Sequence, residues 1–261
     1  MAFLRRGKKI GVIEFQGIVG RAIRADTHLP LLERARTSSR FGAVVLVIDS
    51  PGGSAAAAEE LHLAVKKLAD KKPVVAYIRG LGASGALYIS IAAHKTVSLR
   101  NALIGSIGVV TARPIFEELI KKIGVAMSVQ KSGANKDMYQ PWRQPTAEES
   151  EKMQALLDDV YERFIADVAR ERGIDPVKVR EMATGEVFTA KRAQELGLID
   201  DFGDLNTALD LAAEMAGIKR REMYLRPRRR FSPIVRAGFG REAVEAVVDE
   251  IEAGLTSRVW L

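Results

Sequence analysis

The chain contains no cysteine among its 261 residues. This absence excludes disulfide bonds, a thiolate nucleophile and zinc held by cysteine. The chain also lacks any run approaching the ~18 to 20 consecutive apolar residues that a membrane-spanning helix requires. Its basic N-terminus continues into an alternating strand pattern rather than an apolar stretch with a cleavage site, so we do not expect a signal peptide.

Aromatic residues are scarce, at 6% of the chain, and they are not interleaved with basic residues as in a platform that stacks nucleobases. We therefore expect no nucleic-acid partner. The net charge is +7, and much of it lies near the two ends of the chain. The basic residues there are Arg5, Arg6, Lys8, Lys9, Lys219, Arg220, Arg221, Arg226, Arg228, Arg229 and Arg230. They fit solvated chain ends, and the alternative is peripheral contact with an anionic membrane surface.

The first half of the sequence carries apolar runs that follow the periods of strands and helices. Residues 43–48 and 74–78 are continuously apolar, as in strands buried on both faces of a sheet. Residues 54–68 between them place apolar side chains at helical spacing. This order predicts a βαβ unit, and we expect an α/β fold with a largely parallel sheet.

Other elements flank this unit on both sides. Strands are predicted at 9–15, 96–99 and 125–130, and helices at 114–123, 176–182, 190–196 and 205–215. The clearest helix begins after Thr146, which forms a capping-box pattern with Glu149, and it ends at Gly173. The last segment, 241–255, is an amphipathic helix whose polar face is acidic, which favours packing on a subunit or on this chain over a membrane.

Two glycine-rich turns follow the two strongest strands. The first, residues 49–53, ends in Pro-Gly-Gly, and its amide groups at a helix start suit a developing oxyanion. A plain strand-to-helix turn has the same pattern. The second turn, residues 80–86, places Ser84 among small residues before a helix. Ser84 fits a nucleophile and equally a helix N-cap, and its surroundings lack the G-x-S-x-G spacing of α/β-hydrolases.

A nucleophilic serine needs a base, and the residues alone leave that base open. The three histidines, His28, His62 and His94, have neither the context of a catalytic base nor a metal-binding spacing. We expect them at the surface or as caps, with His28 in a polar connection before the first helix. Lysine is the alternative, and either Lys131 or Lys136 could face a site. No metal and no cofactor are expected.

Four motifs occur in a consistent order along the chain. They are P-G-G after a strand, A-S-G before a helix, G-S-x-G at 105–108 and K-S-G-x-x-K-D at 131–137. Together they resemble the S49 signal peptide peptidase family of the ClpP/crotonase superfamily, and the likeness runs from about residue 11 to residue 203. P-G-G alone is shared with many crotonase-fold proteins, whereas the full set is far more specific. The resemblance implies a ClpP/crotonase-like α/β fold of repeated ββα units over 1–218, followed by a basic segment and a C-terminal helical extension over 219–261.

The resemblance also implies a catalytic Ser/Lys dyad, with Ser84 as nucleophile and Lys136 as base. It implies Gly53 and Gly85 as oxyanion-hole donors and Ser106 as the residue that positions the lysine. The function it implies is a serine endopeptidase, a homo-oligomer that cleaves short hydrophobic peptides such as signal-peptide remnants through an acyl-enzyme. A lysine with the ordinary pKa of ~10.4 is neutral in roughly one molecule in 2,500 at pH 7, so a lysine base has to lie where burial lowers its pKa.

The chain departs from the family pattern in two places. Relatives commonly carry an N-terminal membrane anchor, so we expect a soluble cytoplasmic or membrane-peripheral protein, or an extracytoplasmic one if an anchor was removed. The serine turn reads S-G-A where many relatives have S-G-G, which narrows the pocket without stopping the chemistry. Two alternatives are a crotonase-type acyl-CoA hydratase or isomerase, which usually uses acidic residues, and a non-catalytic adaptor that acts through its basic tail.

Overall fold

The computed structural model describes residues 7–227 and 259–260. These residues fall into two compact units, unit 1 (7–109, 161–227 and 260) and unit 2 (110–160 and 259). Arg5, Arg6, Arg228, Arg229, Arg230 and the predicted helix at 241–255 lie outside the described residues. No helix in the described part of the chain is long and apolar enough to cross a membrane. The predicted boundary between residues 218 and 219 stays a prediction.

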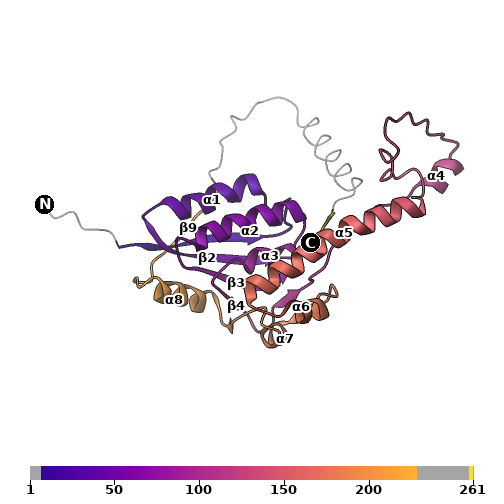
Figure 1. The fold of residues 1–261 in the computed structure, drawn as a ribbon. Coiled ribbons are helices and arrows are strands. Elements are labelled where there is room, and N and C mark those ends of the chain that lie inside the picture. The colour runs from indigo at the N-terminus through magenta and orange to yellow at the C-terminus, as the bar shows by residue number, and fades with distance from the viewer. Residues whose placement is uncertain (1–6, 228–258, 261) are drawn as a thin grey trace, which may run out of the picture. The chain divides into compact units, whose positions relative to one another are not determined.

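Unit 1 is built on a mainly parallel sheet whose strands run in the order β7-β5-β3-β2-β1-β9 (Figure 1). Its strands are β1 (Lys9–Gln16), β2 (Phe41–Ser50), β3 (Val74–Ala83), β4 (Lys95–Ser98), β5 (Leu103–Gly105), β7 (Val187–Thr189), β8 (Asp201–Phe202) and β9 (Glu222–Tyr224). β4 pairs with β3 and β8, and only the β5–β7 pair of this sheet is antiparallel. The expected α/β fold with a largely parallel sheet is confirmed.

Helices cover both faces of this sheet. They are α1 (Ala25–Thr37), α2 (Ala55–Ala69), α3 (Gly85–Ser90), α6 (Pro176–Met182), α7 (Ala190–Glu195) and α8 (Leu205–Met215). In Figure 1, α1, α2 and α3 lie over one face of the sheet and α8 over the other. Val45 and Val47 of β2 pack in one cluster with Leu209 of α8. Because successive side chains of a strand point to opposite faces, the intervening Leu46 and Ile48, also fully buried, face the other layer. This explains the continuous apolar runs in the sequence.

β3 changes its neighbour halfway along its length, and this places the residue that follows it. Residues 75–78 pair with β4, whereas residues 81–83 pair with β5. The last residues of β3 are therefore held between β2 and β5, and the chain then turns directly into α3 at Ser84.

The long helix α5 (Ala147–Arg172) begins in unit 2 and ends in unit 1. Its predicted capping box is confirmed: Glu149 N–H donates to Thr146 Oγ1 at 3.2 Å, and Thr146 N–H donates to Glu149 Oε2 at 2.9 Å. Gly173, with φ of +64°, follows its last residue. The apolar stripe is buried only in its C-terminal half, where Phe164 is 1% exposed, whereas Leu156 is 55% exposed.

Unit 2 also contains β6 (Val110–Thr111) and α4 (Glu117–Lys122), and β10 (Val259–Trp260) pairs with β6. The predicted strand at 125–130 is wrong. All of these residues are exposed, and no strand of the described chain pairs with them, so the alternating pattern has no partner to complete a ladder. The predicted helix at 114–123 is shorter than expected, because Phe116 N–H bonds to the Pro141 carbonyl at 2.7 Å before the helix begins.

Candidate active site

Ser84 occupies a strained backbone conformation at the junction of β3 and α3. Its φ is 56° and its ψ is −123°, a combination that non-glycine residues rarely adopt and that costs of the order of 1–3 kcal/mol. Its N–H donates to the Gly105 carbonyl at 2.8 Å, and its own carbonyl accepts the Tyr88 N–H at 3.0 Å. The β3–β5 pair and the first turn of α3 therefore hold the strain in place. Strain of this kind at a strand-to-helix turn is typical of a nucleophile.

The Ser84 side chain does not act as a helix cap. Although Ser84 stands at the N-cap position of α3, its hydroxyl makes no capping bond and no other hydrogen bond within residues 7–227 and 259–260. By contrast, Ser54 at the start of α2 accepts the Ala57 N–H at 3.5 Å. The interpretation of Ser84 as an N-cap is therefore wrong, and its hydroxyl is left available for chemistry.

The two glycines predicted as oxyanion donors lie next to each other. A methyl group placed on Gly85 would lie 3.5 Å from the Gly53 amide nitrogen, so the P-G-G turn approaches the start of α3 closely. In the described part of the chain, neither glycine's N–H donates to a protein acceptor. Gly53 has a φ of +148°, which is a glycine conformation. Two free amide donors beside a strained serine can stabilise negative charge on a substrate oxygen.

Ser106 lies close to the same junction. It is the one described non-glycine residue besides Ser84 with a positive φ, at 54°. Ser106 directly follows Gly105, whose carbonyl holds the Ser84 N–H, and its own N–H donates to the Glu186 carbonyl at 2.6 Å. Ser84, Gly53, Gly85 and Ser106 are thus brought together in unit 1, although they are far apart in the sequence.

The two candidate lysines belong to unit 2, and their surroundings differ. Lys131 Nζ lies 2.5 Å from Asp137 Oδ1 and donates to the Ala134 carbonyl at 2.9 Å. Lys136 is exposed and has no hydrogen-bond or ion-pair partner in the part of the chain that the structure describes. The Lys131 amine is thus engaged by a carboxylate and a backbone carbonyl, whereas within the described residues the Lys136 amine is not. Within the described part of unit 2, Lys136 therefore lacks the carboxylate partner that Lys131 has, but it also lacks the burial that a lysine base requires.

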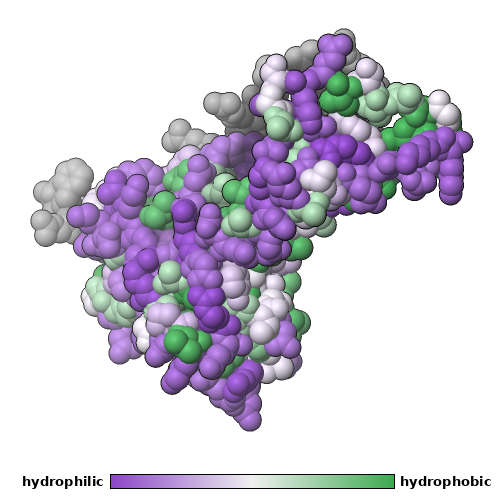
Figure 2. Space-filling view, turned by 45° about the vertical axis from the view of Figure 1, so that its right-hand side comes forward, coloured by the Kyte–Doolittle hydropathy of each residue, from purple (hydrophilic) through white to green (hydrophobic). Residues whose placement is uncertain are grey.

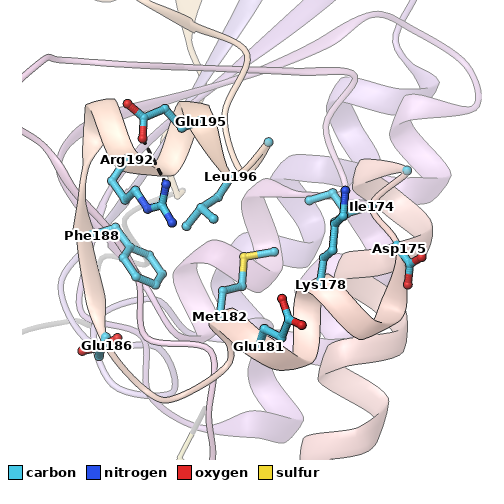
Figure 3. A pocket seen from close by; sticks show the side chains of 12 residues that line it. Ile174, Asp175, Lys178, Glu181, Met182, Glu186, Phe188, Arg192, Glu195 and Leu196 are labelled. Carbon is cyan, nitrogen blue, oxygen red and sulfur yellow. Dashed lines mark hydrogen bonds and ion pairs between the residues drawn. The ribbon is translucent and has the colours of Figure 1, made fainter.

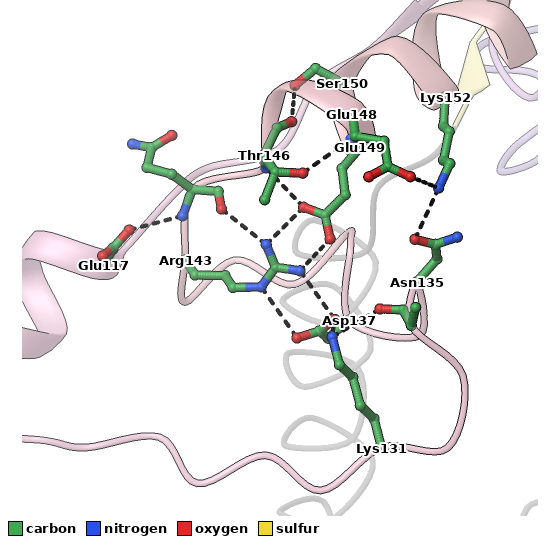
Figure 4. A network of polar contacts seen from close by, with 12 residues as sticks. Glu117, Lys131, Asn135, Asp137, Arg143, Thr146, Glu148, Glu149, Ser150 and Lys152 are labelled. Atoms are coloured by element: carbon green, nitrogen blue, oxygen red, sulfur yellow. Dashed lines mark hydrogen bonds and ion pairs between the residues drawn. The ribbon is translucent and has the colours of Figure 1, made fainter.

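A network centred on Arg143 holds the lysine-bearing turn to the start of α5 (Figure 4). Its guanidinium donates to Asp137 Oδ2 at 3.2 Å and to both carboxylate oxygens of Glu149, at 2.8 and 2.5 Å. Hydrogen bonds from Arg143 and then Lys131 lower the pKa of Asp137 to about 2. Hydrogen bonds from Arg143 and then the Thr146 N–H lower the pKa of Glu149 to about 2.

The sequence model of peptidase family S49 matches residues 66–219, which is more than half of the chain. The chain belongs to peptidase family S49. Family membership makes it a serine peptidase, as the sequence resemblance implied.

The relatives of this S49 peptidase differ in length. It is 34% identical over 252 residues to slr0021 of Synechocystis sp., a protein named as a candidate protease. The alignment covers 95% of this chain and 89% of the relative. It is 34% identical over 220 residues to the chloroplastic serine protease SPPA of Arabidopsis thaliana. This alignment covers 84% of this chain but only 32% of the relative. It is 34% identical over 188 residues to a protein of Enterococcus faecium named as a candidate signal peptide peptidase SppA, over 71% of this chain and 54% of the relative.

Two solved structures share the fold of the S49 peptidase. A mutant of the 1510-N membrane-bound stomatin-specific protease has a TM-score of 0.54 at 17% identity, covering 85% of this chain and 99% of that one. A mutant of ClpP1 from Listeria monocytogenes has a TM-score of 0.52 at 16% identity, covering 76% of this chain and 93% of that one. The expected ClpP-like fold is confirmed.

Each of the three histidines of the S49 peptidase has a backbone hydrogen-bond partner, and none of them bonds to Ser84. His28 is buried inside α1, with Nε2 at 3.1 Å from the Glu14 carbonyl. His62 is buried in α2, with Nδ1 at 2.7 Å from the Tyr88 carbonyl, and burial lowers its pKa. The expectation of surface or capping roles is wrong for both, because helical packing encloses them. His94 Nδ1 accepts the Val74 N–H at 3.1 Å, as a cap would.

The contact between α3, the helix that follows Ser84, and α5 was not identified from the sequence. Tyr88 donates a hydrogen bond to Asp167 of α5, and its ring stacks on His62 at 4.5 Å. Burial, followed by the bond to Asp167, raises the pKa of Tyr88. The spacing of Tyr88 from Ser84, one helical turn along α3, is the signal that could have identified it. This contact anchors α3 to α5 within unit 1.

A cavity of about 590 Å³ opens in unit 1 beside α6, β7 and α7 (Figure 3). Met182, Phe188 and Leu196 point into it, and Arg192 pairs with Glu195 at 3.1 Å on its edge. Glu186 at its rim holds the Ser106 N–H. Apolar side chains line this cavity together with charged ones such as Lys178 and Glu181, so it is a candidate place for a side chain of a peptide. Within the described residues no group of three or more histidine, aspartate or glutamate side chains is placed to hold a metal ion.

We expect the Arg143 network to lose its contribution to stability as the pH falls. The pKa values of Asp137 and Glu149 are lowered in the folded state, so the stabilisation is complete above their unfolded values of ~4. It disappears as the pH falls through the folded values of about 2. Hydrogen exchange of residues 131–150, corrected for intrinsic rates, should show protection falling between pH 5 and pH 2. The control is Arg143→Gln, which should show low protection at both pH 5 and pH 2. Wild-type protection that is the same at pH 2 as at pH 5 would contradict the stabilising role of the Arg143 network.

Proposed function

We propose that this S49 peptidase is an endopeptidase that hydrolyses short hydrophobic peptides, such as signal-peptide remnants, through an acyl-enzyme on Ser84. The observation that carries the proposal is the strained Ser84, whose hydroxyl is unpaired and which lies beside the free amides of Gly53 and Gly85. The substrate class is supported by the name of the relative from Enterococcus faecium, a candidate signal peptide peptidase.

The proposed mechanism has two steps. Lys136 takes the proton of Ser84 as Oγ attacks the peptide carbonyl, and the Gly53 and Gly85 amides donate to the oxyanion. The C–N bond then breaks, and the leaving amine takes the proton from Lys136. In the second step, water activated by Lys136 attacks the ester carbonyl and releases the acid and free Ser84. The proposal requires Lys136 Nζ within hydrogen-bonding reach of Ser84 Oγ, with Ser106 positioning the amine.

A fluorophosphonate probe tests the nucleophile. The wild type should be labelled at Ser84, and Ser84→Ala should not be labelled, because the phosphorus forms its bond to the activated hydroxyl. Ser54→Ala is the matched control, since Ser54 lies at the corresponding helix start after the P-G-G turn but caps α2. Labelling that persists in Ser84→Ala, or is lost in Ser54→Ala alone, would overturn the proposal. Absence of labelling in the wild type would favour a crotonase-type activity.

Gly85→Ala should reduce peptide hydrolysis about tenfold or more with a smaller effect on stability, because displacing one oxyanion donor weakens transition-state binding. The added methyl would lie 3.1 Å from Ala58 Cβ, so the start of α3 has to shift. Gly80→Ala is the control: its methyl would lie 3.1 Å from Asp49 Oδ1, equally crowded but away from the donor pair. Assays of kcat/KM should show a loss in the first variant only, and equal losses would contradict the role of Gly85.

Self-assembly of the chain is part of the proposal. Unit 2 exposes several large apolar side chains; Ile123 is 64% exposed, Leu156 55% and Leu119 54%. The space-filling view shows such apolar residues in green among the purple polar surface (Figure 2). Clustered exposed apolar residues are typical of protein interfaces. Light scattering after size exclusion should give a mass that is a multiple of the chain mass, and a monomer at micromolar concentration would contradict it. Membrane contact through the basic ends stays a prediction.

A further inference from the structure

A second cavity, of about 360 Å³, lies wholly within unit 2. It opens to solvent and is lined by the segment after β6, the turn that follows the lysine motif and the first turns of α5. The lining residues that bear on its chemistry are Arg113, Met138, Tyr139, Pro145, Glu149 and Met153. The proposed mechanism uses none of them.

Two hydrogen-bond donors in this cavity are buried and unpaired. Arg113 Nη1 and Tyr139 Oη have no hydrogen-bond partner within the described chain, although neither atom is accessible to solvent. The Arg113 guanidinium lies over the Tyr139 ring, with its carbon 5.2 Å from the ring centre, so both donors belong to one wall. Burial raises the pKa of Tyr139, and its hydroxyl therefore keeps its proton at neutral pH. Buried donors of this kind are normally satisfied, so two in one cavity indicate a missing acceptor.

The carboxylate of Glu149 also lines the cavity, but it accepts no hydrogen bond from either donor. Both oxygens of Glu149 already accept hydrogen bonds from Arg143, and one of them also accepts the Thr146 N–H (Figure 4). The charge of Glu149 is therefore matched by Arg143, and Arg113 remains the uncompensated charge of the cavity. A ligand with one negative charge fits this balance.

The remaining walls restrict the ligand further. Met138, Met153 and Pro145 also line the cavity. Methionine side chains adapt to aliphatic groups of different shape. One cationic donor, one neutral donor and apolar walls match a carboxylate attached to an aliphatic group better than a more highly charged and fully hydrated phosphate.

We propose that this cavity binds the terminal carboxylate of a peptide, with Arg113 and Tyr139 as donors and the methionines in contact with an aliphatic last side chain. That the ligand is a peptide rests on the proposed function, whereas the carboxylate rests on the two donors. Such a site would hold the C-terminal end of a substrate or product, and peptides with a free C-terminus would be preferred over amidated ones.

Binding of N-acetyl-leucine and N-acetyl-leucinamide to the full-length protein tests the proposal, since neither compound requires cleavage. Calorimetry should show the acid binding about tenfold or more tightly than the amide, because a charged hydrogen bond is lost. Arg113→Gln should weaken binding of the acid about tenfold or more, and Tyr139→Phe about threefold or more. Labelled methionine methyl groups should report the acid through shifts at Met138 and Met153.

Arg100→Gln is the matched control, because Arg100 also lies over an aromatic ring, 4.7 Å from the centre of Phe202, but belongs to unit 1. It should bind the acid as the wild type does. Equal binding of acid and amide, unchanged binding by Arg113→Gln, or tighter binding of inorganic phosphate would each overturn the proposal. If Arg113→Gln fails to fold, Tyr139→Phe decides. Failure of the fluorophosphonate experiment would remove the peptidase mechanism and leave carboxylate binding standing.

Discussion

Lys136→Ala is expected to lower kcat/KM for a fluorogenic peptide at least about 1,000-fold while the fold remains intact, because Ser84 then lacks its base. Lys131→Ala is the matched control in the same motif. Lys131 is bound to Asp137 and the Ala134 carbonyl, so its loss should loosen the turn and reduce activity about tenfold or less.

The double variant sharpens this test. If Ser84 and Lys136 act as one unit, Ser84→Ala combined with Lys136→Ala should lose no more activity than Ser84→Ala alone. Circular dichroism and thermal unfolding should match the wild type in both single variants. The proposed dyad would be contradicted if Lys136→Ala turned over near the wild-type rate, or if Lys131→Ala lost more activity than Lys136→Ala. Another residue would then have to be the base.

Arg172→Ala is expected to lower the free energy of unfolding of unit 1 by about 3 kcal/mol, because it removes the buried ion-pair partner of the partly buried Asp200 carboxylate and leaves it with the more exposed Lys95 and the Thr96 N–H. The Arg172 side chain is 8% exposed; it lies 3.0 Å from Asp200 Oδ2 and donates to the Gly197 carbonyl at 2.7 Å. The same carboxylate oxygen accepts the Thr96 N–H at 2.7 Å. This cluster joins the end of α5 to β4 and to the segment before β8.

Arg180→Ala is the control for this prediction. Arg180 pairs with Glu162 across an exposed surface, where the side chains are 54% and 50% exposed, so its removal should change stability far less than the removal of Arg172. Urea unfolding of both variants measures the difference. Burial raises the pKa of Asp200, but Arg172, Thr96 and Lys95 outweigh it and lower the net value. The stabilisation is therefore complete above pH ~4 and lost as the pH falls below the lowered pKa. A loss in Arg172→Ala no larger than in Arg180→Ala would contradict the role of the cluster.

Elements with strong local signals were predicted closely from the sequence. The helices α6 and α8 occupy the predicted residues, 176–182 and 205–215, because Asp175 and Asp204 cap them and apolar residues follow the helical period. The capping box of Thr146 and Glu149 is equally local. The strand predicted at 125–130 failed because a strand needs a neighbour, and its alternating pattern says nothing about whether one exists.

Some features of the candidate site could likewise be recognised from the sequence, and others could not. The glycine-rich turn around Ser84 could be recognised from the sequence, but its role as nucleophile or cap could not. The choice between Lys131 and Lys136 came from the family resemblance and stays a prediction; the structure shows only that Lys131 is paired with Asp137. The carboxylate-binding cavity had no sequence signal, because its donors, Arg113 and Tyr139, come from separate segments.

By itself, the sequence determined the α/β class, the capped helices, the family and the choice of Ser84 as a candidate nucleophile. These depend on propensities and motifs within a few residues of one another. Only the tertiary structure decided that the Ser84 hydroxyl is uncapped, that its backbone is strained, and that Gly53 approaches Gly85. The reason is physical: the strain is held by a hydrogen bond to Gly105 on another strand, and the two glycines meet because β2 and β3 are parallel neighbours. Contacts between distant segments create these properties, and no local pattern encodes them.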